Sequence, residues 1–258
     1  MDIHAHVLPG IDDGPPDLES ALAMARAAAN AGTTAIAATP HLRPDFPDVH
    51  LDELGWRCRD LRAALEREQI PIQLVGGAEA SLGWALEASA EQLALASFGQ
   101  KGHDLLVEAP FSPVIGLDRL LDDLQAKGYR VTLAHPERSA EFHRDEPSLR
   151  RLVDQGVLLQ INSDSLVGSS GSPIQRFARH LCTESLAHAL ASDGHRAAEW
   201  RPVTTLAEGV AAAAELVGAE RAQWLAEGSP RAIVNATELP APPAIAGASK
   251  RWRLFGRR

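Results

Sequence analysis

The chain of 258 residues alternates short apolar segments with helix-forming segments, and this alternation restricts its possible folds more than any other feature. After an opening strand, apolar segments follow at residues 34–39, 71–76, 104–107, 129–134, 157–161 and 187–192. Helix-forming segments separate them, at residues 18–31, 51–68, 84–96, 117–127, 148–154 and 173–181. Short apolar strands in alternation with helices are typical of a parallel sheet. We therefore predict an α/β fold, a (β/α)7 barrel of about seven strands.

The carboxyl-terminal part of the sequence changes in composition near residue 238. Helix-forming segments at residues 203–217, 222–226 and 229–235 complete a barrel domain that we expect to span residues 1–237. Residues 239–249 are rich in Pro, Ala and Gly without periodicity, which is typical of a linker. The tail, residues 250–258, interleaves basic with aromatic and apolar residues. Such a tail is typical either of a peripheral contact with an anionic membrane or of a solvated end.

Charge, cysteine content and hydropathy exclude several classes of protein. The formal net charge is −9, and without the five basic residues of the tail 20 basic residues remain against 34 acidic ones, a net of −14. An acidic body of this kind disfavours nucleic acid as a partner. Neither cysteine, Cys58 or Cys182, begins a Cys-x5-Arg phosphate loop. Two cysteines fit a reducing compartment, and no apolar run approaches the roughly 18 residues of a membrane span, so we expect a cytoplasmic protein.

The first fourteen residues, M-D-I-H-A-H-V-L-P-G-I-D-D-G, carry the first candidate site. His4 and His6 lie two positions apart, and in a strand this spacing places both imidazoles on one face, where they can share a metal ion. The turn that follows contains Asp12 and Asp13, so carboxylate ligands lie close to the imidazoles. Either aspartate can be the ligand, because a turn can present either carboxylate.

Potential metal ligands also follow the other predicted strands. Six of the seven strands contain or precede one: His4 and His6, His41, Glu79, Glu108, His135, and Asp193 with His195. In a parallel barrel the carboxyl ends of all strands meet on one face, where the active sites of this architecture lie. We therefore predict that five histidines and several carboxylates converge on one metal site.

The order of these motifs identifies a family. The chain resembles the polymerase and histidinol phosphatase (PHP) superfamily of metal-dependent phosphoesterases, and within it the bacterial tyrosine-protein phosphatases of capsular and exopolysaccharide synthesis. The matching stretches are D-I-H-A-H-V-L-P-G-I-D-D-G at 2–14, A-T-P-H at 38–41, G-A-E at 77–79, V-E-A-P at 107–110, L-A-H-P-E-R at 133–138, Q-I-N-S-D-S-L-V-G at 160–168 and A-S-D-G-H at 191–195. The resemblance implies a distorted TIM-like barrel, the PHP fold.

The resemblance also implies three metal ions. The first ion would be held by His4, His6, Glu79 and Asp193, the second by Glu79, Glu108 and His135, and the third by Asp13, His41 and His195. Glu79 would bridge the first two ions. Manganese is the ion that the family suggests, with iron, zinc, cobalt and magnesium as alternatives, because mixed imidazole and carboxylate ligation alone does not choose among them.

Two arginines are candidates for contact with phosphate. Arg138, in L-A-H-P-E-R, keeps the position that the family gives to an arginine, and a planar guanidinium matches the fork of a phosphate. The family also places an arginine five residues after the last histidine, whereas here Trp200 holds that position and Arg201 follows it. Glu137, Asn162 and Ser165 are candidates to orient the ligands. His50, His103, His143, His180 and His188 fall outside the pattern, and we expect surface or helix positions for them.

The leading hypothesis is hydrolysis of phosphotyrosine by a hydroxide that bridges the metal ions, with a phosphotyrosine protein as the substrate. The resemblance points to a membrane-associated bacterial tyrosine kinase as that protein. A phosphatase of the histidinol phosphate type and a scaffold that binds phosphoprotein without turnover are the alternatives. An amidohydrolase is disfavoured, because that class carries a bridging lysine where this chain has Glu108.

Overall fold

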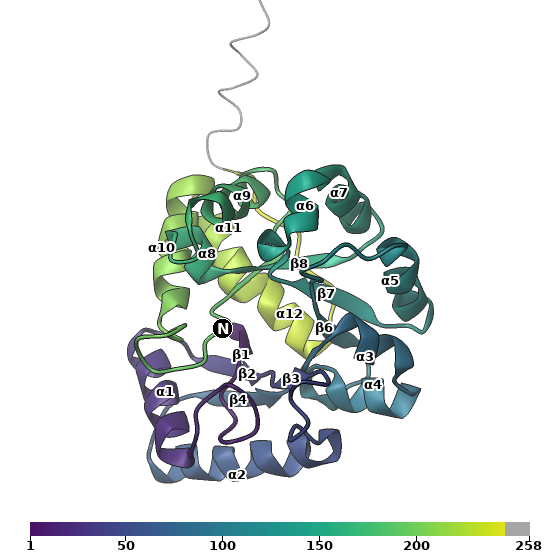
Figure 1. Cartoon of the computed structure of the whole chain (residues 1–258). Coiled ribbons are helices and arrows are strands. Elements are labelled where there is room, and N and C mark those ends of the chain that lie inside the picture. The colour runs from purple at the N-terminus through teal and green to yellow at the C-terminus, as the bar shows by residue number, and fades with distance from the viewer. Residues whose placement is uncertain (246–258) are drawn as a thin grey trace, which may run out of the picture.

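The computed structural model describes residues 1–245 and contains a ring of parallel strands surrounded by helices (Figure 1). Its strands are β1 (Asp2–Ala5), β2 (Ala35–Ala38), β3 (His41–Leu42), β4 (Gln73–Gly76), β5 (Glu79–Ala80), β6 (Asp104–Glu108), β7 (Arg130–Ala134), β8 (Leu158–Asn162) and β9 (Ala189–Ala191). All paired strands are parallel. This confirms the prediction of a barrel of parallel strands.

The barrel is distorted because its strands form two hydrogen-bonded sheets, with the orders β1-β2-β4 and β3-β5-β6-β7-β8-β9. The second and third predicted strands each belong to both sheets: β2 continues into β3, and β4 continues into β5. Pro40 lies between β2 and β3 and has no backbone N–H to donate to a continuous ladder. Seven strand positions around the ring therefore correspond to nine short strands.

The ring closes where β9 meets β1. The backbone N–H of Asp193 donates to the carbonyl of His4 over 2.8 Å, and that of His6 donates to the carbonyl of Gly194 over 2.9 Å. The buried Asp2 carboxylate accepts the backbone N–H of Ser192 over 3.0 Å and its hydroxyl over 2.5 Å. Residues about 190 positions apart in the sequence are thereby held side by side.

Helices cover the outside of the barrel and one of its ends. They are α1 (Leu18–Asn30), α2 (Leu54–Arg67), α3 (Leu82–Glu87), α4 (Ala90–Ala96), α5 (Leu117–Ala126), α6 (Ala140–Arg144), α7 (Glu146–Asp154), α8 (Ser163–Val167), α9 (Ser172–Thr183), α10 (Thr205–Val217), α11 (Ala219–Gln223) and α12 (Ser229–Asn235). Short 3-10 turns lie at Leu51–Glu53, Phe98–Gln100 and Pro136–Arg138, and a π turn lies at Trp224–Gly228. Among the described residues, no helix is long and apolar enough to cross a membrane.

The strands pack one face against the outer helices and turn the opposite face toward the interior of the barrel. Val131 and Leu133 of β7 pack with the helices in the main core. Leu106 of β6 lies instead in a second buried cluster with Ile233 and Val234 of α12, the helix that crosses the ring in Figure 1. Side chains alternate along a strand, so Leu106 and Glu108 share the inner face. The interior is therefore apolar beside α12 and polar at the carboxyl ends of the strands.

The structure differs from three expectations about helices. The segment 84–96 forms two helices, because the side chain of Ser89 caps a new helix at Gln92, whose own side chain accepts the Ser89 N–H. The polar residues after β8 form α8, and the residues after the 3-10 turn at Pro136–Arg138 form α6, neither of which was predicted. Both helices have five residues, which is too short for a clear hydrophobic period.

The predicted linker is described only as far as residue 245 and contains no helix or strand up to that point. Its carbonyls at Pro240 and Pro243 accept hydrogen bonds from Trp224 and Arg221, over 2.8 and 3.2 Å, so this part follows the surface of the body. The basic tail, and with it the expected contact with an anionic membrane, lies outside the described residues.

Candidate metal centre

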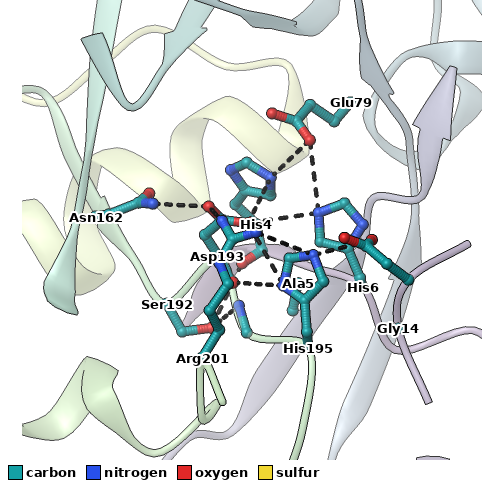
Figure 2. A network of polar contacts seen from close by, with 12 residues as sticks. His4, Ala5, His6, Gly14, Glu79, Asn162, Ser192, Asp193, His195 and Arg201 are labelled. Carbon is teal, nitrogen blue, oxygen red and sulfur yellow. Dashed lines mark hydrogen bonds and ion pairs between the residues drawn. The ribbon is translucent and has the colours of Figure 1, made fainter. Parts of the chain in front are cut away.

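The nine side chains predicted as metal ligands lie together at the carboxyl ends of the barrel strands. His4 belongs to β1, His41 to β3, Glu79 to β5 and Glu108 to β6. His6, Asp13, His135, Asp193 and His195 come from the segments that directly follow β1, β7 and β9. Figure 2 shows His4, His6, Glu79, Asp193 and His195 pointing toward one another. Their role as ligands stays a prediction, whereas their convergence is a property of the structure.

The ligand atoms form one connected cluster. Four groups each place their nitrogen and oxygen atoms within 4.8 Å of one another: His6, Asp13, His41 and His195; His4, His135 and Asp193; His4, His6 and Glu79; and His41, Glu79 and Glu108. His4, His6, His41 and Glu79 each belong to two groups. The geometry therefore places several cation-sized positions next to one another, but it groups His135 with His4 and Asp193 rather than with Glu108.

Glu79 occupies the centre of this cluster. Its Oε2 atom lies 3.3 Å from His4 Nε2, 3.5 Å from His6 Nε2 and 2.9 Å from His41 Nδ1, and its Oε1 atom lies 2.9 Å from His135 Nε2. Burial alone would raise the pKa of Glu79, but the surrounding imidazoles hold this pKa well below its ordinary value. The carboxylate is thus charged although it is buried, which suits an oxygen that bridges cations.

Three histidines are oriented so that Nε2 faces the cluster. His4 Nδ1 donates to the Gln160 side-chain oxygen over 2.9 Å, and His195 Nδ1 donates to the Asp193 carbonyl over 2.9 Å. His6 Nδ1 donates to Asp12 over 2.8 Å. A proton held on Nδ1 leaves the lone pair of Nε2 free, which is the form that binds a metal ion.

The cluster also contains buried polar atoms without a hydrogen-bond partner in the described part of the chain. These are Nε2 of His4 and of His6, Nδ1 of His41 and of His135, and one carboxylate oxygen each of Asp13, Glu79 and Asp193. Buried polar atoms are normally paired, because leaving one unpaired costs about 1–3 kcal/mol. Atoms of this chemistry that face one another without partners fit divalent cations such as manganese, iron or zinc.

The turn after β1 distinguishes between the two adjacent aspartates. Asp12 orients His6, accepts the Gly14 N–H over 2.9 Å and accepts the His41 N–H over 3.2 Å. Asp13 instead places Oδ1 3.1 Å from His195 Nε2 and 3.5 Å from His41 Nε2. A Cβ atom on Gly14 would lie 2.4 Å from the His6 carbonyl, so this tight turn requires glycine. The geometry favours Asp13 as the ligand and Asp12 as its support.

The turn after β9 places Asp193 and His195 on different parts of the cluster. Asp193 Oδ1 lies 3.5 Å from His4 Nε2, whereas His195 faces Asp13. Asp193 has a φ of 51°, in the left-handed region that costs a non-glycine residue energy. Gly194 does not have a positive φ, so backbone freedom is not the reason why this turn contains glycine. A Cβ atom on Gly194 would instead lie 2.7 Å from the Val203 Cα, so glycine is needed here for close packing.

Both candidate phosphate-binding arginines reach Asp193. Arg138 donates to Asp193 Oδ2 over 3.2 Å and to Asp164 over 2.7 Å, and Arg201 also contacts Asp193 Oδ2. Burial and the charge of Arg138 lower the pKa of Arg201 to about 10, so the Arg201 guanidinium remains charged at neutral pH. Two positive charges thus lie at the edge of the cluster.

Arg201 reaches the site although it stands one residue later in the sequence than the arginine of the family. Glu199 and Arg201 have φ values of 70° and 48°, and the His195 N–H donates to the Arg201 carbonyl over 2.8 Å. With these two residues in the left-handed region, the loop accommodates one more residue before the arginine, and the Arg201 side chain still reaches Asp193. A contact between Arg201 and phosphate stays a prediction.

Several supporting residues were only guessed from the sequence or were missed. Asn162 donates to Asp193 Oδ2 over 2.7 Å, and Glu137 accepts the Asn162 N–H over 3.0 Å, in keeping with the guess that both support the ligands. Arg43 was missed: it donates to both oxygens of Glu108, over 3.0 and 3.2 Å. Its place two residues after His41, directly after the end of β3, was a usable signal.

Gln160 and Asp164, which contact His4 and Arg138, were also missed as supporting residues. The five histidines outside the sequence pattern lie outside the cluster. His188 contradicts the expectation of a surface or helix position. It is largely buried just before β9, where its Nδ1 accepts the Leu159 N–H over 3.1 Å.

Comparison with known proteins places the chain in one family. The model of the family described as capsular polysaccharide synthesis, CpsB/CapC, matches residues 1–235. The tyrosine-protein phosphatase YwqE of Bacillus subtilis is 33% identical over 257 residues, with 99% of each chain covered. CpsB of Streptococcus pneumoniae, also named a tyrosine-protein phosphatase, is 24% identical over 91% of this chain and 98% of its own.

A solved structure agrees with these sequence matches. It comes from the crystal structures of YwqE from Bacillus subtilis and CpsB from Streptococcus pneumoniae, described as unique metal-dependent tyrosine phosphatases. It superposes with a TM-score of 0.82 and 30% identity, and covers 95% of this chain and 98% of its own. The fold, the ordered motifs and these comparisons together show that the chain belongs to the CpsB/CapC family of capsular polysaccharide synthesis proteins.

Proposed function

We propose that this protein is a metal-dependent protein-tyrosine phosphatase that hydrolyses phosphotyrosine on a protein substrate. The observation that carries the proposal is the set of unpartnered imidazole and carboxylate atoms that face one another beside two charged arginines. Cations between these atoms and guanidinium groups at their edge are what a phosphate ester with two negative charges requires. The names of the relatives support phosphotyrosine as the substrate.

We propose three ions in this cluster, with manganese as the physiological metal. The nine candidate ligands are His4, His6, Asp13, His41, Glu79, Glu108, His135, Asp193 and His195. Glu79 and Glu108 support this proposal, because burial and the charge of Glu79 raise the pKa of Glu108, and a cation between the two carboxylates removes their repulsion. When bound, such ions neutralise phosphate charge and lower the pKa of water.

Residues of this chain would hold the phosphoryl group in place. Arg138 is fixed from both sides, by Asp193 and by Asp164, and the Ser170 hydroxyl donates to the same Asp164 oxygen over 2.9 Å. A guanidinium that is already oriented loses little entropy when it binds the equatorial oxygens. Arg201, which is largely buried, would supply a second positive charge, because it contacts the same Asp193 Oδ2 atom as Arg138.

A cysteine nucleophile does not fit this structure. Cys58 and Cys182 are both buried, and burial raises the pKa of their thiols to about 11 and about 12. Reactive cysteines have lowered pKa values in electropositive surroundings. Tyrosine, with an ordinary pKa near 10, is moreover a leaving group that departs without a strong general acid.

The proposed substrate is a membrane-associated bacterial tyrosine kinase that controls capsular or exopolysaccharide synthesis. The family description and the names of the relatives support this choice. We place the reaction in the cytoplasm, because two free, buried thiols fit a reducing compartment.

The decisive experiment compares metal-free and manganese-loaded protein on a phosphotyrosine peptide and on histidinol phosphate. We expect release of phosphate from the peptide only after manganese is restored, and a much lower kcat/KM on histidinol phosphate. Activity that survives complete chelation would refute the metal-dependent mechanism. A preference for histidinol phosphate would refute the proposed substrate and leave the metal site intact.

A further inference from the structure

Three aromatic rings at the mouth of the metal centre each lie against a candidate ligand histidine. Phe46 stacks on His41 with ring centroids 4.6 Å apart, and Phe111 stacks on His135 at 5.9 Å. Trp200 meets His195 edge to face at 5.0 Å. The three aromatic residues come from three different loops, which follow β3, β6 and β9.

Two of these rings are exposed although the histidines below them are buried. Phe111 is 54% exposed and Trp200 is 51% exposed, whereas the three histidines are buried. Phe46 is only partly exposed and is covered by its own neighbours, since Arg43 lies 5.9 Å from its ring. Large apolar side chains exposed beside a polar site are typical of contact with a ligand.

Trp200 is held by neighbouring side chains, and Phe111 lies directly after the strand that carries a candidate ligand. Both Arg196 and Arg201 lie 5.6 Å from the centroid of the Trp200 ring. Trp200 thus touches a candidate ligand and a candidate phosphate-binding arginine at once. Phe111 begins the loop directly after Ala109 and Pro110, where the strand that carries Glu108 ends. Each ring is therefore connected to the residues that would hold the phosphate.

We propose that Phe111 and Trp200 contact the aromatic ring of the substrate and set a preference for aryl over alkyl phosphates. This inference rests on the proposed phosphatase function. In phosphotyrosine the phenyl ring is bonded to the ester oxygen, so a phosphate at the buried cluster places the phenyl ring one step outward, on the side where the exposed rings of Phe111 and Trp200 lie against buried histidines. Aromatic rings pair edge to face or offset, as these two side chains allow.

The same geometry disfavours phosphoserine. Its phosphate is separated from the backbone by one methylene group, so reaching the buried histidines would bring the peptide backbone between Phe111 and Trp200. That backbone would lose water at an apolar rim without gaining hydrogen-bond partners there. Phe111 and Trp200 would therefore favour phosphotyrosine over phosphoserine by the length of the side chain as well as by contact with its ring.

The test measures ring recognition without turnover, by calorimetric titration of the manganese-loaded full chain with phenylphosphonate and methylphosphonate. These compounds share the phosphonate group, cannot lose it by ester hydrolysis, and differ in the ring. We expect the wild-type protein to prefer phenylphosphonate, and Phe111→Leu or Trp200→Leu to lose about threefold to tenfold of that preference with unchanged affinity for methylphosphonate. Trp200→Phe keeps a ring and should retain most of it.

The matched control is Trp56→Leu, which removes an exposed tryptophan of α2 that is 40% exposed and lies against Arg57 instead of the cluster. It should leave both affinities unchanged. Metal analysis of every variant verifies that the ions remain bound. Equal weakening of both phosphonates, or a full phenyl preference in both leucine variants, would overturn the inference.

Failure of this inference is distinguishable from failure of the proposed function. A protein that binds phenylphosphonate through Phe111 and Trp200 but leaves phosphotyrosine peptide intact would refute the function and support the aromatic contact. A protein that hydrolyses the peptide with equal efficiency in the wild-type and leucine variants would support the function and refute the contact.

Discussion

Replacing His195 with alanine tests whether the cluster consists of separable metal positions. The His195 ring is completely buried, lies 4.1 Å from the His6 ring, and places Nε2 3.1 Å from Asp13 Oδ1. Only one of the four ligand groups contains His195, namely the group with His6, Asp13 and His41. We therefore expect His195→Ala to lose about one ion per chain and to retain the ions at the groups without it.

The size of the effect follows from the linkage between binding and folding. An ion that binds only the folded chain stabilises it by about 2.7 kcal/mol at a free concentration of 100 times its Kd. For a chain of this length, 1 kcal/mol shifts Tm by about 2–4 °C, so one lost ion corresponds to roughly 5–11 °C. Burial and the neighbouring His6 lower the pKa of His195 to about 4, so at pH 7 the side chain is neutral and gives up no proton on binding.

The assay compares the rise in Tm on metal loading between the wild type and His195→Ala. This comparison removes the effect of the cavity that the truncated His195 side chain leaves. Tm is measured for wild-type and variant protein, each metal-free and manganese-loaded, because truncation of the buried ring lowers both variant values alike. The rise in Tm on loading should be smaller in His195→Ala by the amount above, and elemental analysis should show one ion fewer. The exposed His50 supplies the control, His50→Ala. Equal metal content and an equal rise in Tm would remove His195 from the site.

Three further predictions concern residues around the cluster. Asp12→Asn removes the charge that orients His6 but keeps the shape of the side chain, so a competitive titration should show manganese affinity weaker by about 10- to 100-fold. An unchanged affinity would contradict the role of Asp12 in orienting His6. Arg138→Lys keeps the charge but loses the fork, so kcat/KM on phosphotyrosine peptide should fall about 100-fold at constant metal content, and wild-type kinetics would exclude this arginine from phosphate binding. Burial, then Arg221, lowers the pKa of His188 to about 4, so the unfolded chain binds the extra proton between pH 6.5 and 4. In urea unfolding of the metal-free proteins, the wild type should lose about 3 kcal/mol more than His188→Asn as the pH falls through this range, and an equal loss in both would contradict the role of His188.

The positions of the site residues were predictable because the fold converts a local pattern into a global one. His41, Glu79, Glu108 and His135 are each found at the end of a short apolar segment, and all parallel strands of a barrel end on the same face. Locating the strands was therefore enough to bring these side chains together. Gln160 was missed because it lies within β8 and not after its end, and Arg43 was missed because it follows β3, a two-residue strand beyond the predicted segment 34–39, although both contact predicted ligands.

Choices between adjacent residues were not predictable in this way. Asp12 and Asp13 have the same chemistry and lie in the same turn, and they differ only in which distant side chains they meet. Arg201 reaches Asp193 because two residues adopt left-handed backbone angles, which no sequence period encodes. The division of β2 from β3 and of β4 from β5 likewise depends on how the ring closes.

The sequence by itself determined the main alternation of strands and helices and, except for the choice between Asp12 and Asp13, the set of converging side chains, because hydrophobic period and strand-end position are local properties that neighbouring residues specify. The order of its motifs indicated the family. The tertiary structure alone decided which aspartate faces His195, how Arg201 enters the site, and that Phe111 and Trp200 lie against His135 and His195, two candidate ligands. The contact between Asp13 and His195 joins residues far apart in the chain, and its geometry depends on the register of ring closure between Asp2 and Ser192. A register of this kind is set by the packing of the whole barrel and not by any one segment.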